Sequence, residues 1–379
     1  MTSTDLPTHI PATDPAGALP QQPADARAAS RRPIWVAAVA AALLVSTVAG
    51  AAVLPVPYVA LRPGSARPVT EQVLVEGAPS YPPAESIAYT TVNVGSTSLL
   101  EAFAGWLDDE VDVVPEERVR GDRSVAENRR YNAQLMDTSK LVAVAVALRH
   151  LGHEVTIRTS GTVVREIIEG SPAEEVLEVD DVIVAVDGQP VDQPDVIGAM
   201  LQGGGPGGTH LLTVERPAGS STRIDVSLQT IAAPDDPDRA VIGIAPEDRI
   251  VGFDFPIDVT IDSGTVGGPS AGLAFTLAVL DVLTPGELTG GHRVAVTGTM
   301  SLDGTVGPVG GGAQKAITVR DAGYEVFLVP SDELKEVEAA IGGDLRVVAV
   351  DTLTEALDAL DSLGGNARSL EGAAGGGSP

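Results

Sequence analysis

A glycine-rich loop contains the residue of this sequence that is best placed for nucleophilic chemistry. Residues 264–272 read Gly-Thr-Val-Gly-Gly-Pro-Ser-Ala-Gly, between an alternating apolar segment at 255–262 and a continuous apolar segment at 273–283. We expect a strand and a helix there, with Ser270 at the helix N-terminus. Backbone N–H groups are free at such an end, and the helix dipole favours negative charge. The loop therefore suits an acyl-transfer nucleophile with its own oxyanion hole, although a serine N-cap behind a glycine loop gives the same pattern.

A base for this serine has few candidates, because the chain contains only three lysines, Lys140, Lys315 and Lys335. Lys315 follows a second glycine loop, and no acidic residue occurs at 305–319. A lysine acts as a base only when neutral, so its pKa must fall well below its usual value. Burial among Gly, Ala and Ile without a neighbouring carboxylate would lower that pKa. The alternative for Lys315 is a solvated lysine on a helix, as we expect for Lys335 among its glutamates.

Other nucleophilic arrangements are poorly supported. The Gly-x-Ser-x-Gly pattern at 268–272 also fits a nucleophile elbow, which requires a histidine further along the chain. Only His292 follows Ser270, within a Gly-Gly-His-Arg stretch. No lysine lies three residues after a serine, and the absence of cysteine excludes thiol catalysis and disulfides. With five histidines and no cysteine, we expect neither a metal site nor a bound cofactor.

Composition limits the classes of partner. The 379 residues carry a formal net charge of −28, which excludes a nucleic-acid binder with a basic surface. Apolar residues make up 44% of the chain and aromatic residues only 3%, so we expect an aliphatic core. The length allows two or three domains.

An uncharged apolar stretch lies close to the N-terminus. We predict a disordered tail at 1–32 and a transmembrane helix at 33–54, since about 20 apolar residues cross a bilayer. The alternative is a cleaved signal peptide, whose apolar region is usually shorter. Arg31 and Arg32 precede the apolar stretch, which predicts a cytoplasmic N-terminus. We therefore expect a single-pass protein of the cell membrane, with everything after residue 54 outside the cytoplasm.

The rest of the chain changes character several times, which predicts an α+β protein with two folded domains. Residues 55–139 are expected to form a connector with short helices, including one at 97–107. Short strands and turn signals mark a domain at 140–231, followed by a linker at 232–239. Strands and helices alternate over 240–363, and the glycine-rich end at 364–379 is expected to be flexible.

Three ordered motifs resemble the proteolytic domain of the Lon protease family: Gly-Pro-Ser-Ala-Gly at 268–272, Val-Thr-Gly-Thr at 296–299 and Gly-x-Val-x-Pro-Val-Gly-Gly at 304–311. The resemblance covers about 240–363. It implies that Ser270 is the catalytic nucleophile, that Lys315 is its base, and that the Thr297 hydroxyl helps to orient the lysine. It also allows a homo-oligomer, since Lon-like domains usually assemble in rings.

The sequence departs from the Lon pattern in two respects. Thr299 stands where these proteases often have an acidic residue. Lon enzymes usually carry an ATPase module, yet no lysine here has the glycines of a phosphate-binding loop before it, so we expect no use of ATP.

Residues 155–230 resemble a PDZ domain. The similarity rests on Gly-Ser-Pro-Ala at 170–173, on Asp-Val-Ile-Val-Ala-Val-Asp-Gly at 181–188, and on the helix expected after them. PDZ domains bind an extended peptide end as an added strand. Residues 151–154 are a weak candidate for the loop that would bind the peptide carboxylate, and a PDZ-like spacer that binds nothing is the alternative.

Taken together, the anchor, the PDZ-like region and the Lon-like region resemble membrane-anchored Lon-like proteases with a PDZ domain. This resemblance implies an ATP-independent serine endopeptidase that cleaves polypeptides outside the cytoplasmic membrane, with a PDZ domain that engages substrate or partner peptides. The alternative is a catalytically inert, membrane-anchored PDZ scaffold that retains a Lon-like fold.

Overall fold

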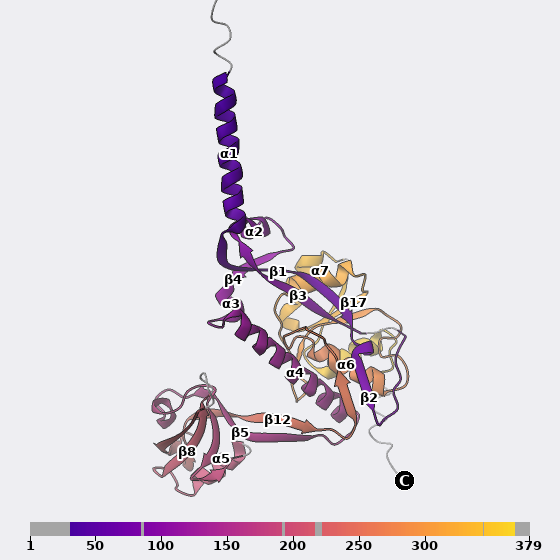
Figure 1. The fold of residues 1–379 in the computed structure, drawn as a ribbon. Helices are drawn as coiled ribbons and strands as arrows, with labels where there is room; N and C mark the ends of the chain where they lie inside the picture. The colour runs from indigo at the N-terminus through magenta and orange to yellow at the C-terminus, as the bar shows by residue number, and fades with distance from the viewer. Residues whose placement is uncertain (1–30, 85–86, 192–193, 217–221, 344, 368–379) are drawn as a thin grey trace, which may run out of the picture.

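The computed structural model describes residues 31–84, 87–191, 194–216, 222–343 and 345–367 (Figure 1). Most of the expected N-terminal tail, and all but the first four residues of the expected C-terminal tail, lie outside these ranges. The described chain forms one long helix and two folded units.

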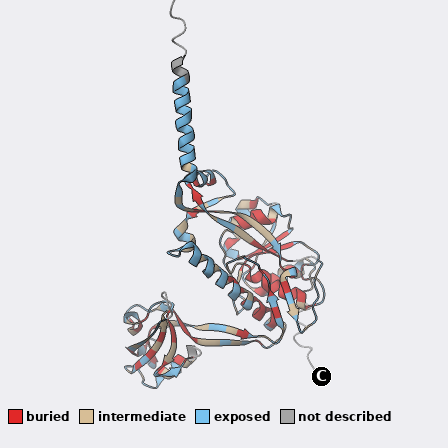
Figure 2. Cartoon of the chain, in the orientation of Figure 1, coloured by how far each residue is buried: buried red, intermediate tan, exposed pale blue. Residues whose placement is uncertain are grey.

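The first helix, α1 (Arg31–Val53), projects away from both folded units, and its residues 35–50 are exposed (Figure 2). Its segment Trp35–Val53 has a mean hydropathy of 2.3 over 19 residues and is not buried at all. At ~1.5 Å per residue this segment is about 28 Å long, close to the ~30 Å apolar core of a bilayer. By length and composition, α1 could cross a membrane, where the sequence analysis expects a span at 33–54.

A six-stranded sheet is the framework of the larger unit, with the strand order β18-β17-β14-β3-β1-β4. Its strands, in that order, are Arg346–Ala349, Val326–Val329, Val294–Val296, Ala88–Ser98, Pro55–Pro68 and Asp112–Pro115. Strands β14, β17 and β18 are parallel, and β14 is also parallel to β3. Strand β1 pairs antiparallel with both β3 and β4.

Half of this sheet comes from residues 55–139, where the sequence analysis expects a connector. The structure differs because β14 is only three residues long and fully buried. Without β3 beside it, the backbone N–H and C=O groups along one edge of β14 would be buried and unpaired. Pairing with Ala88 and Tyr89 of β3 removes that cost, so the larger unit already begins at Pro55.

Helices cover both faces of the sheet, which gives the mixed α+β architecture expected from the sequence. Alternate residues of β14 and β17 point to opposite faces, as the period of a strand requires. On one face, Val296 and Leu328 share a core with α6 (Gly272–Leu283) and α9 (Leu353–Ser362). The core of the other face includes Ala295, Phe327 and residues of α7 (Gly312–Asp321) and α8 (Leu334–Ile341).

A long helix, α4 (Val125–His150), packs against α6 in the larger unit. Ser124 and Glu127 form a capping box at its start. Residues 142–148 are all buried, because Val-Ala-Val-Ala-Val-Ala-Leu is apolar on every side of the helix. The expected boundary at residue 140 assigns this half of α4 to the PDZ-like domain, but the structure places it in the core of the larger unit.

The smaller unit is a second sheet with its own core, in the order β12-β5-β6-β8-β9. These strands are Ile244–Asp254, Thr156–Ile167, Val182–Val186, Thr209–Arg216 and Thr222–Gln229, with β7 (Gln189–Pro190) beside β6 and helix α5 at Pro194–Gln202. Figure 1 shows β5 and β12 extending from this sheet to the larger unit as a two-stranded ribbon.

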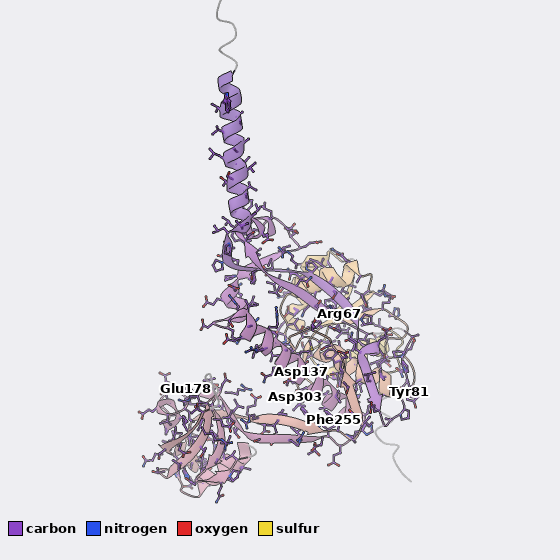
Figure 3. The ribbon with its side chains drawn as sticks, in the orientation of Figure 1. Arg67, Tyr81, Asp137, Glu178, Phe255 and Asp303 are labelled. Atoms are coloured by element: carbon purple, nitrogen blue, oxygen red, sulfur yellow. The ribbon has the colours of Figure 1, made fainter. Side chains whose placement is uncertain are left out.

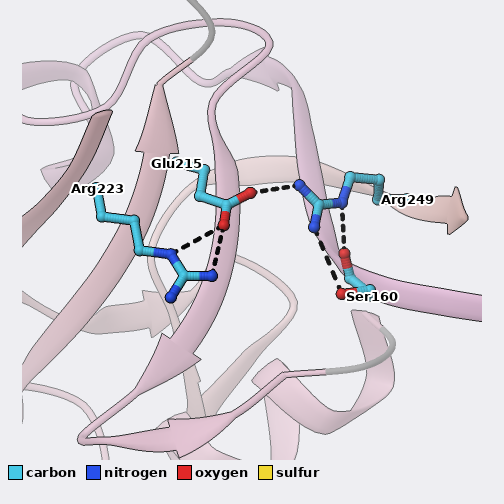
Figure 4. A network of polar contacts seen from close by, with 4 residues as sticks. All are labelled: Ser160, Glu215, Arg223 and Arg249. Atoms are coloured by element: carbon cyan, nitrogen blue, oxygen red, sulfur yellow. Dashed lines mark hydrogen bonds and ion pairs between the residues drawn. The ribbon is translucent and has the colours of Figure 1, made fainter. Parts of the chain in front are cut away.

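An ion-pair network joins the ribbon to the second sheet (Figure 4). Glu215 on β8 accepts hydrogen bonds from Arg223 on β9 at 2.7 Å and from Arg249 on β12 at 2.6 Å. Arg249 Nε also donates to the backbone oxygen of Ser160 on β5, at 2.6 Å. The hydrogen bonds from Arg249 and Arg223 lower the pKa of Glu215, so this carboxylate ties three strands together.

Shorter elements complete the two units. The expected linker at 232–239 is a hairpin formed by β10 (Ile231–Ala233) and β11 (Asp236–Val241). The helix expected at 97–107 is α2 (Leu99–Gly105), which begins after Ser98. The remaining elements are β2 (Val73–Glu76) paired with β13 (Asp258–Ile261), β15 (Thr299–Met300) paired with β16 (Val306–Gly307), α3 (Glu116–Arg120), and the 3₁₀ turns η1 (Thr70–Gln72), η2 (Pro172–Glu175) and η3 (Ser331–Glu333).

Candidate active site

The loop before α6 is fixed by contacts with α4. Gly268 has a φ of 93°, which side chains rarely allow, and its N–H donates to the backbone oxygen of Asn132 at 2.8 Å. The buried Ser139 hydroxyl donates to the backbone oxygen of Pro269 at 3.2 Å. Both contacts come from a helix that precedes the loop by more than a hundred residues.

Ser270 lies at the end of this loop, and its backbone is joined to the turn after β14. Its carbonyl oxygen accepts hydrogen bonds from Gly298 N–H at 3.0 Å and from Thr297 Oγ1 at 3.2 Å. At Gly272, a Cβ atom would lie only 2.8 Å from the backbone nitrogen of Met300. Only glycine therefore allows α6 to begin this close to β15.

Two backbone donors remain free beside the Ser270 side chain. Within the ranges that the structure describes, the N–H groups of Ser270 and Ala271 donate to no other residue. They precede the first residue of α6, where the helix dipole adds positive potential. These two groups could stabilise the negative oxygen of a tetrahedral intermediate.

Lys315 lies in the first turn of α7, with only 2% of the residue exposed. Its Nζ donates to Thr297 Oγ1 at 3.1 Å. Burial lowers the pKa of Lys315 to about 8, because the protonated amine loses its hydration. A substantial fraction of this amine is thus neutral near pH 8, as a base requires.

A carboxylate that the sequence analysis did not anticipate lies near this lysine. The negative charge of Glu333, in η3, partly opposes the fall in the pKa of Lys315. Glu333 is itself buried, which raises the pKa of its carboxyl group, and it accepts a hydrogen bond from Val309 N–H at 3.1 Å. The expectation that no carboxylate neighbours Lys315 is therefore wrong, because it considered only residues adjacent in sequence.

Ser270 and Lys315 line one open cavity of about 440 Å³. No direct hydrogen bond joins the two side chains; they are related through Thr297, which contacts both residues. Other walls come from Met136, the loop at 265–267, residues 89–94 of β3 and Arg67, which is labelled in Figure 3. Apart from the loop at 265–267, these wall residues belong to the expected connector at 55–139 and were not predicted to line the site.

A second cavity of about 530 Å³ adjoins the first. The two share Val92, Val94, Met136 and the loop at 265–267 in their walls. The second adds polar residues of α4, among them Lys140 and Asp137, of which Figure 3 labels Asp137. Beyond Tyr89, β3 pairs with no strand on its β14 side in the described part of the chain. The cavities therefore form an elongated depression beside a free strand edge.

The histidine of the alternative triad is elsewhere. His292 is 2.6 Å from Glu325 through Nδ1, and it does not line the cavity that contains Ser270. Among the described residues, no histidine lines the cavity beside Ser270, as the nucleophile-elbow interpretation would require.

Comparison with known proteins identifies two domains. Residues 252–361 match the family model of the Lon protease (S16) C-terminal proteolytic domain, and residues 163–216 match that of the PDZ domain. Both matches lie inside the regions that the sequence analysis assigns to these folds. The first match includes Ser270, Thr297 and Lys315, but not β1, β3 or α4.

Individual relatives are similar over the same region. The Lon protease of Campylobacter concisus is 31% identical over 109 residues, which are 28% of this chain and 13% of that protein. Lon protease 2 of Bacillus subtilis is 30% identical over 117 residues, 31% of this chain and 20% of that protein. The chain thus spans only a small part of these relatives. The PDZ domain of an SdrC-like protein from Listeria monocytogenes is 18% identical, over 23% of this chain and 87% of that domain, with a TM-score of 0.21.

Proposed function

We propose that this chain is a membrane-anchored, ATP-independent serine endopeptidase in which Ser270 is the nucleophile and Lys315 is the base. One observation carries the proposal: the buried amine of Lys315 donates to the Thr297 hydroxyl, which in turn donates to the backbone oxygen of Ser270. Ser270 and Lys315 both line one cavity. Homology of residues 252–361 to the proteolytic domain of Lon proteases supports the reaction class.

The proposed reaction follows from the chemistry of these groups. Neutral Lys315 takes the proton of Ser270 Oγ as that oxygen attacks a peptide carbonyl. The free N–H groups of Ser270 and Ala271 stabilise the resulting oxyanion. The protonated amine then gives its proton to the leaving amine, and water hydrolyses the acyl-enzyme by the same route. Substrate binding has to bring Oγ and Nζ into direct contact, since catalytic hydrogen bonds are often long in unliganded sites.

The substrate that fits best is an extended polypeptide. Its backbone would pair with the free edge of β3 beyond Tyr89, as a strand added to the sheet. Its side chains would occupy the adjoining cavities of about 440 and 530 Å³. A small amide would leave most of this depression empty.

The PDZ domain is proposed to bind a peptide end. A cavity of about 530 Å³ lies between α5 and the start of β12, with apolar walls that include Ile197, Leu201, Ile242 and Ile244. Strand β12 is an edge strand, so a peptide could pair with it. The loop at 151–154 does not line this cavity; the described residues that fit the role best are those around Gly243, which has a φ of 79°.

The proposed topology places the N-terminus in the cytoplasm and both domains outside. It is supported by Arg31 and Arg32 before the apolar segment of α1, because basic residues favour the cytoplasmic side. The absence of a phosphate-binding loop motif from the sequence supports independence from ATP.

The test is proteolysis of an unfolded protein such as casein by the full chain in detergent, without nucleotide. Ser270→Ala and Lys315→Ala should abolish cleavage and labelling by a fluorophosphonate, whereas Lys335→Ala, an exposed lysine of the same domain, should retain both. Cleavage by Ser270→Ala at the wild-type rate would overturn the dyad. A wild-type chain that neither cleaves nor reacts, yet binds peptide ends, would favour the inert PDZ scaffold.

A further inference from the structure

Helix α2 lies at the base of α1. Its first residue, Leu99, donates its N–H to the backbone oxygen of Leu54, one residue after α1 ends, at 2.9 Å. Figure 1 shows α2 where α1 meets the larger unit. The position of α2 along the axis of α1 is therefore fixed by a direct backbone contact.

The side chains of α2 are distributed in an unusual way, with the small residues inside and the large apolar residues outside. Ala102 and Gly105 are buried, and a Cβ at residue 105 would lie 2.6 Å from Val113 Cγ2. The outward residues of α2 and the turn after it are exposed by 37% to 73%: Leu99, Leu100, Phe103, Trp106 and Leu107. We call these five residues the α2 patch; Figure 2 shows α2 exposed beside α1.

We propose that the α2 patch inserts into the outer interfacial layer of the lipid bilayer that α1 crosses. The inference rests on the proposed membrane anchoring and deepens it, since it assigns a second membrane contact to the folded part of the chain. If Trp35–Val53 occupies the ~30 Å apolar core, then Leu54 is at the boundary, and α2 begins one hydrogen bond away.

The chemistry of the patch fits a lipid surface at that depth. Trp and Phe rings are favoured at the membrane interface, where one side of the ring is apolar and the other is wet. The chain contains only two tryptophans, Trp35 at the start of the apolar segment and Trp106 in the patch, so each would lie near one face of the bilayer. Exposure of several large apolar residues to water would otherwise be costly.

Charge determines which lipid surface is suitable. Helix α2 and the turn after it contain no Lys or Arg; the exposed Glu101 lies between patch residues, and Asp108, Asp109 and Glu110 follow. Attraction to anionic headgroups therefore contributes nothing, and burial of apolar area has to provide the binding. We expect the patch to insert into zwitterionic lipid, and we expect this insertion to be insensitive to salt concentration.

The test is depth-dependent fluorescence quenching in phosphatidylcholine vesicles that contain the full chain. Trp35→Phe leaves Trp106 as the single tryptophan. Bromine on the lipid chains near the headgroup should remove most of its emission, bromine near the bilayer centre should remove less, and aqueous iodide should have little effect. Leu211→Trp in a chain without Trp35 and Trp106 is the matched control, because Leu211 is 45% exposed on β8, a strand that Figure 1 shows well away from α1.

The outcomes separate this inference from the anchor itself. Flotation with vesicles after alkaline washing shows that α1 anchors the chain. If the chain floats with vesicles but Trp106 is quenched by iodide and not by bromolipid, the insertion of the α2 patch is overturned. The membrane anchoring by α1 would still stand in that case. An emission shift of Trp106 that depends on the protein-to-lipid ratio, without bromolipid quenching, would instead assign the patch to a second copy of the chain and would equally overturn this insertion.

Discussion

Lys315 Nζ and Thr297 Oγ1 lie 3.1 Å apart, with both residues almost completely buried. The threonine hydroxyl has one proton, which it donates to the carbonyl oxygen of Ser270 at 3.2 Å. Its lone pairs therefore remain available to accept from the lysine amine. Thr297 thus determines where the amine lies relative to the Ser270 backbone, whichever protonation state the lysine has.

Replacement of Thr297 by valine should impair catalysis without weakening substrate binding. Thr297→Val keeps the volume but removes the acceptor of the Lys315 amine. Because a misplaced base costs catalysis steeply, we expect kcat to fall roughly 10- to 100-fold with little change in KM. Thr297→Ser retains the hydroxyl and should restore most of the activity. Steady-state kinetics on a fluorogenic peptide measure both parameters, and equal kcat for the valine variant and the wild type would contradict this role.

Burial of the Lys315 amine should lower the free energy of unfolding at neutral pH. Its pKa is about 8 in the native state and ~10.4 in the unfolded chain, so the unfolded chain binds more protons between these values. Stability therefore rises with pH through this window, and below pH 8 the native state carries the full cost. We expect Lys315→Met to stabilise the protein by about 1–3 kcal/mol at pH 7, to stabilise it less near pH 10, and to abolish proteolysis.

Unfolding by denaturant in detergent, followed at both pH values, measures this effect. Lys335→Met is the matched control, since Lys335 is exposed on α8 and should show no such pH-dependent gain. A Lys315→Met variant that is less stable than the wild type at pH 7 would indicate that the buried amine is not penalised.

Removal of the Glu333 charge should move the pH dependence of the activity. A protonated Lys315 cannot accept the serine proton, so activity should rise with pH through a midpoint near 8. The Glu333 carboxylate raises the pKa of Lys315, so Glu333→Gln should shift that midpoint to lower pH. The measurement is kcat/KM from pH 6 to pH 10, with the exposed Glu338→Gln as control. A shift to higher pH would contradict the predicted charge coupling.

The candidate site residues that could be named from the sequence are those that short motifs identify. Ser270, Thr297 and Lys315 each adjoin a Gly-containing turn, and the backbone demands of such turns are visible in the sequence. Glu333 and Tyr89 could not be found in this way. They meet the site only because distant segments pack together, and the polar stretch Tyr-Thr-Thr-Val-Asn-Val at 89–94 has too weak an alternation to indicate a strand of the central sheet.

Helix α4 illustrates the same limit for domain boundaries. Its two ends carry helix signals in the sequence, with Ser124 as the N-cap and Gly152 directly after the last turn. Its packing partner has no such signal, because an all-apolar segment such as 142–148 requires burial on every side but specifies no neighbour. Only the structure shows that α4 packs on α6 and that its Asn132 and Ser139 hold the loop before α6.

Asp281 is a buried acid on α6 that has no role in the proposed reaction. Its Oδ1 accepts a hydrogen bond from Leu288 N–H at 2.8 Å, whereas Oδ2 is buried with no partner among the described residues. Burial raises the pKa of Asp281 to about 6, and the negative charge of Glu287 adds to the effect. The ionised form is therefore destabilised inside the protein.

Replacement of Asp281 by asparagine should stabilise the protein at high pH but not at low pH. The native state binds more protons than the unfolded chain between the unfolded pKa of ~3.9 and the native pKa of about 6, so stability falls as pH rises through this window. Asp281→Asn keeps the acceptor for Leu288 and removes the charge. We expect about 1–3 kcal/mol of added stability at pH 8 and almost none at pH 4, by denaturant unfolding, with the exposed Asp358→Asn unchanged. An equal gain at both pH values would show that the amide forms a new hydrogen bond, and that the carboxylate charge is not what destabilises α6.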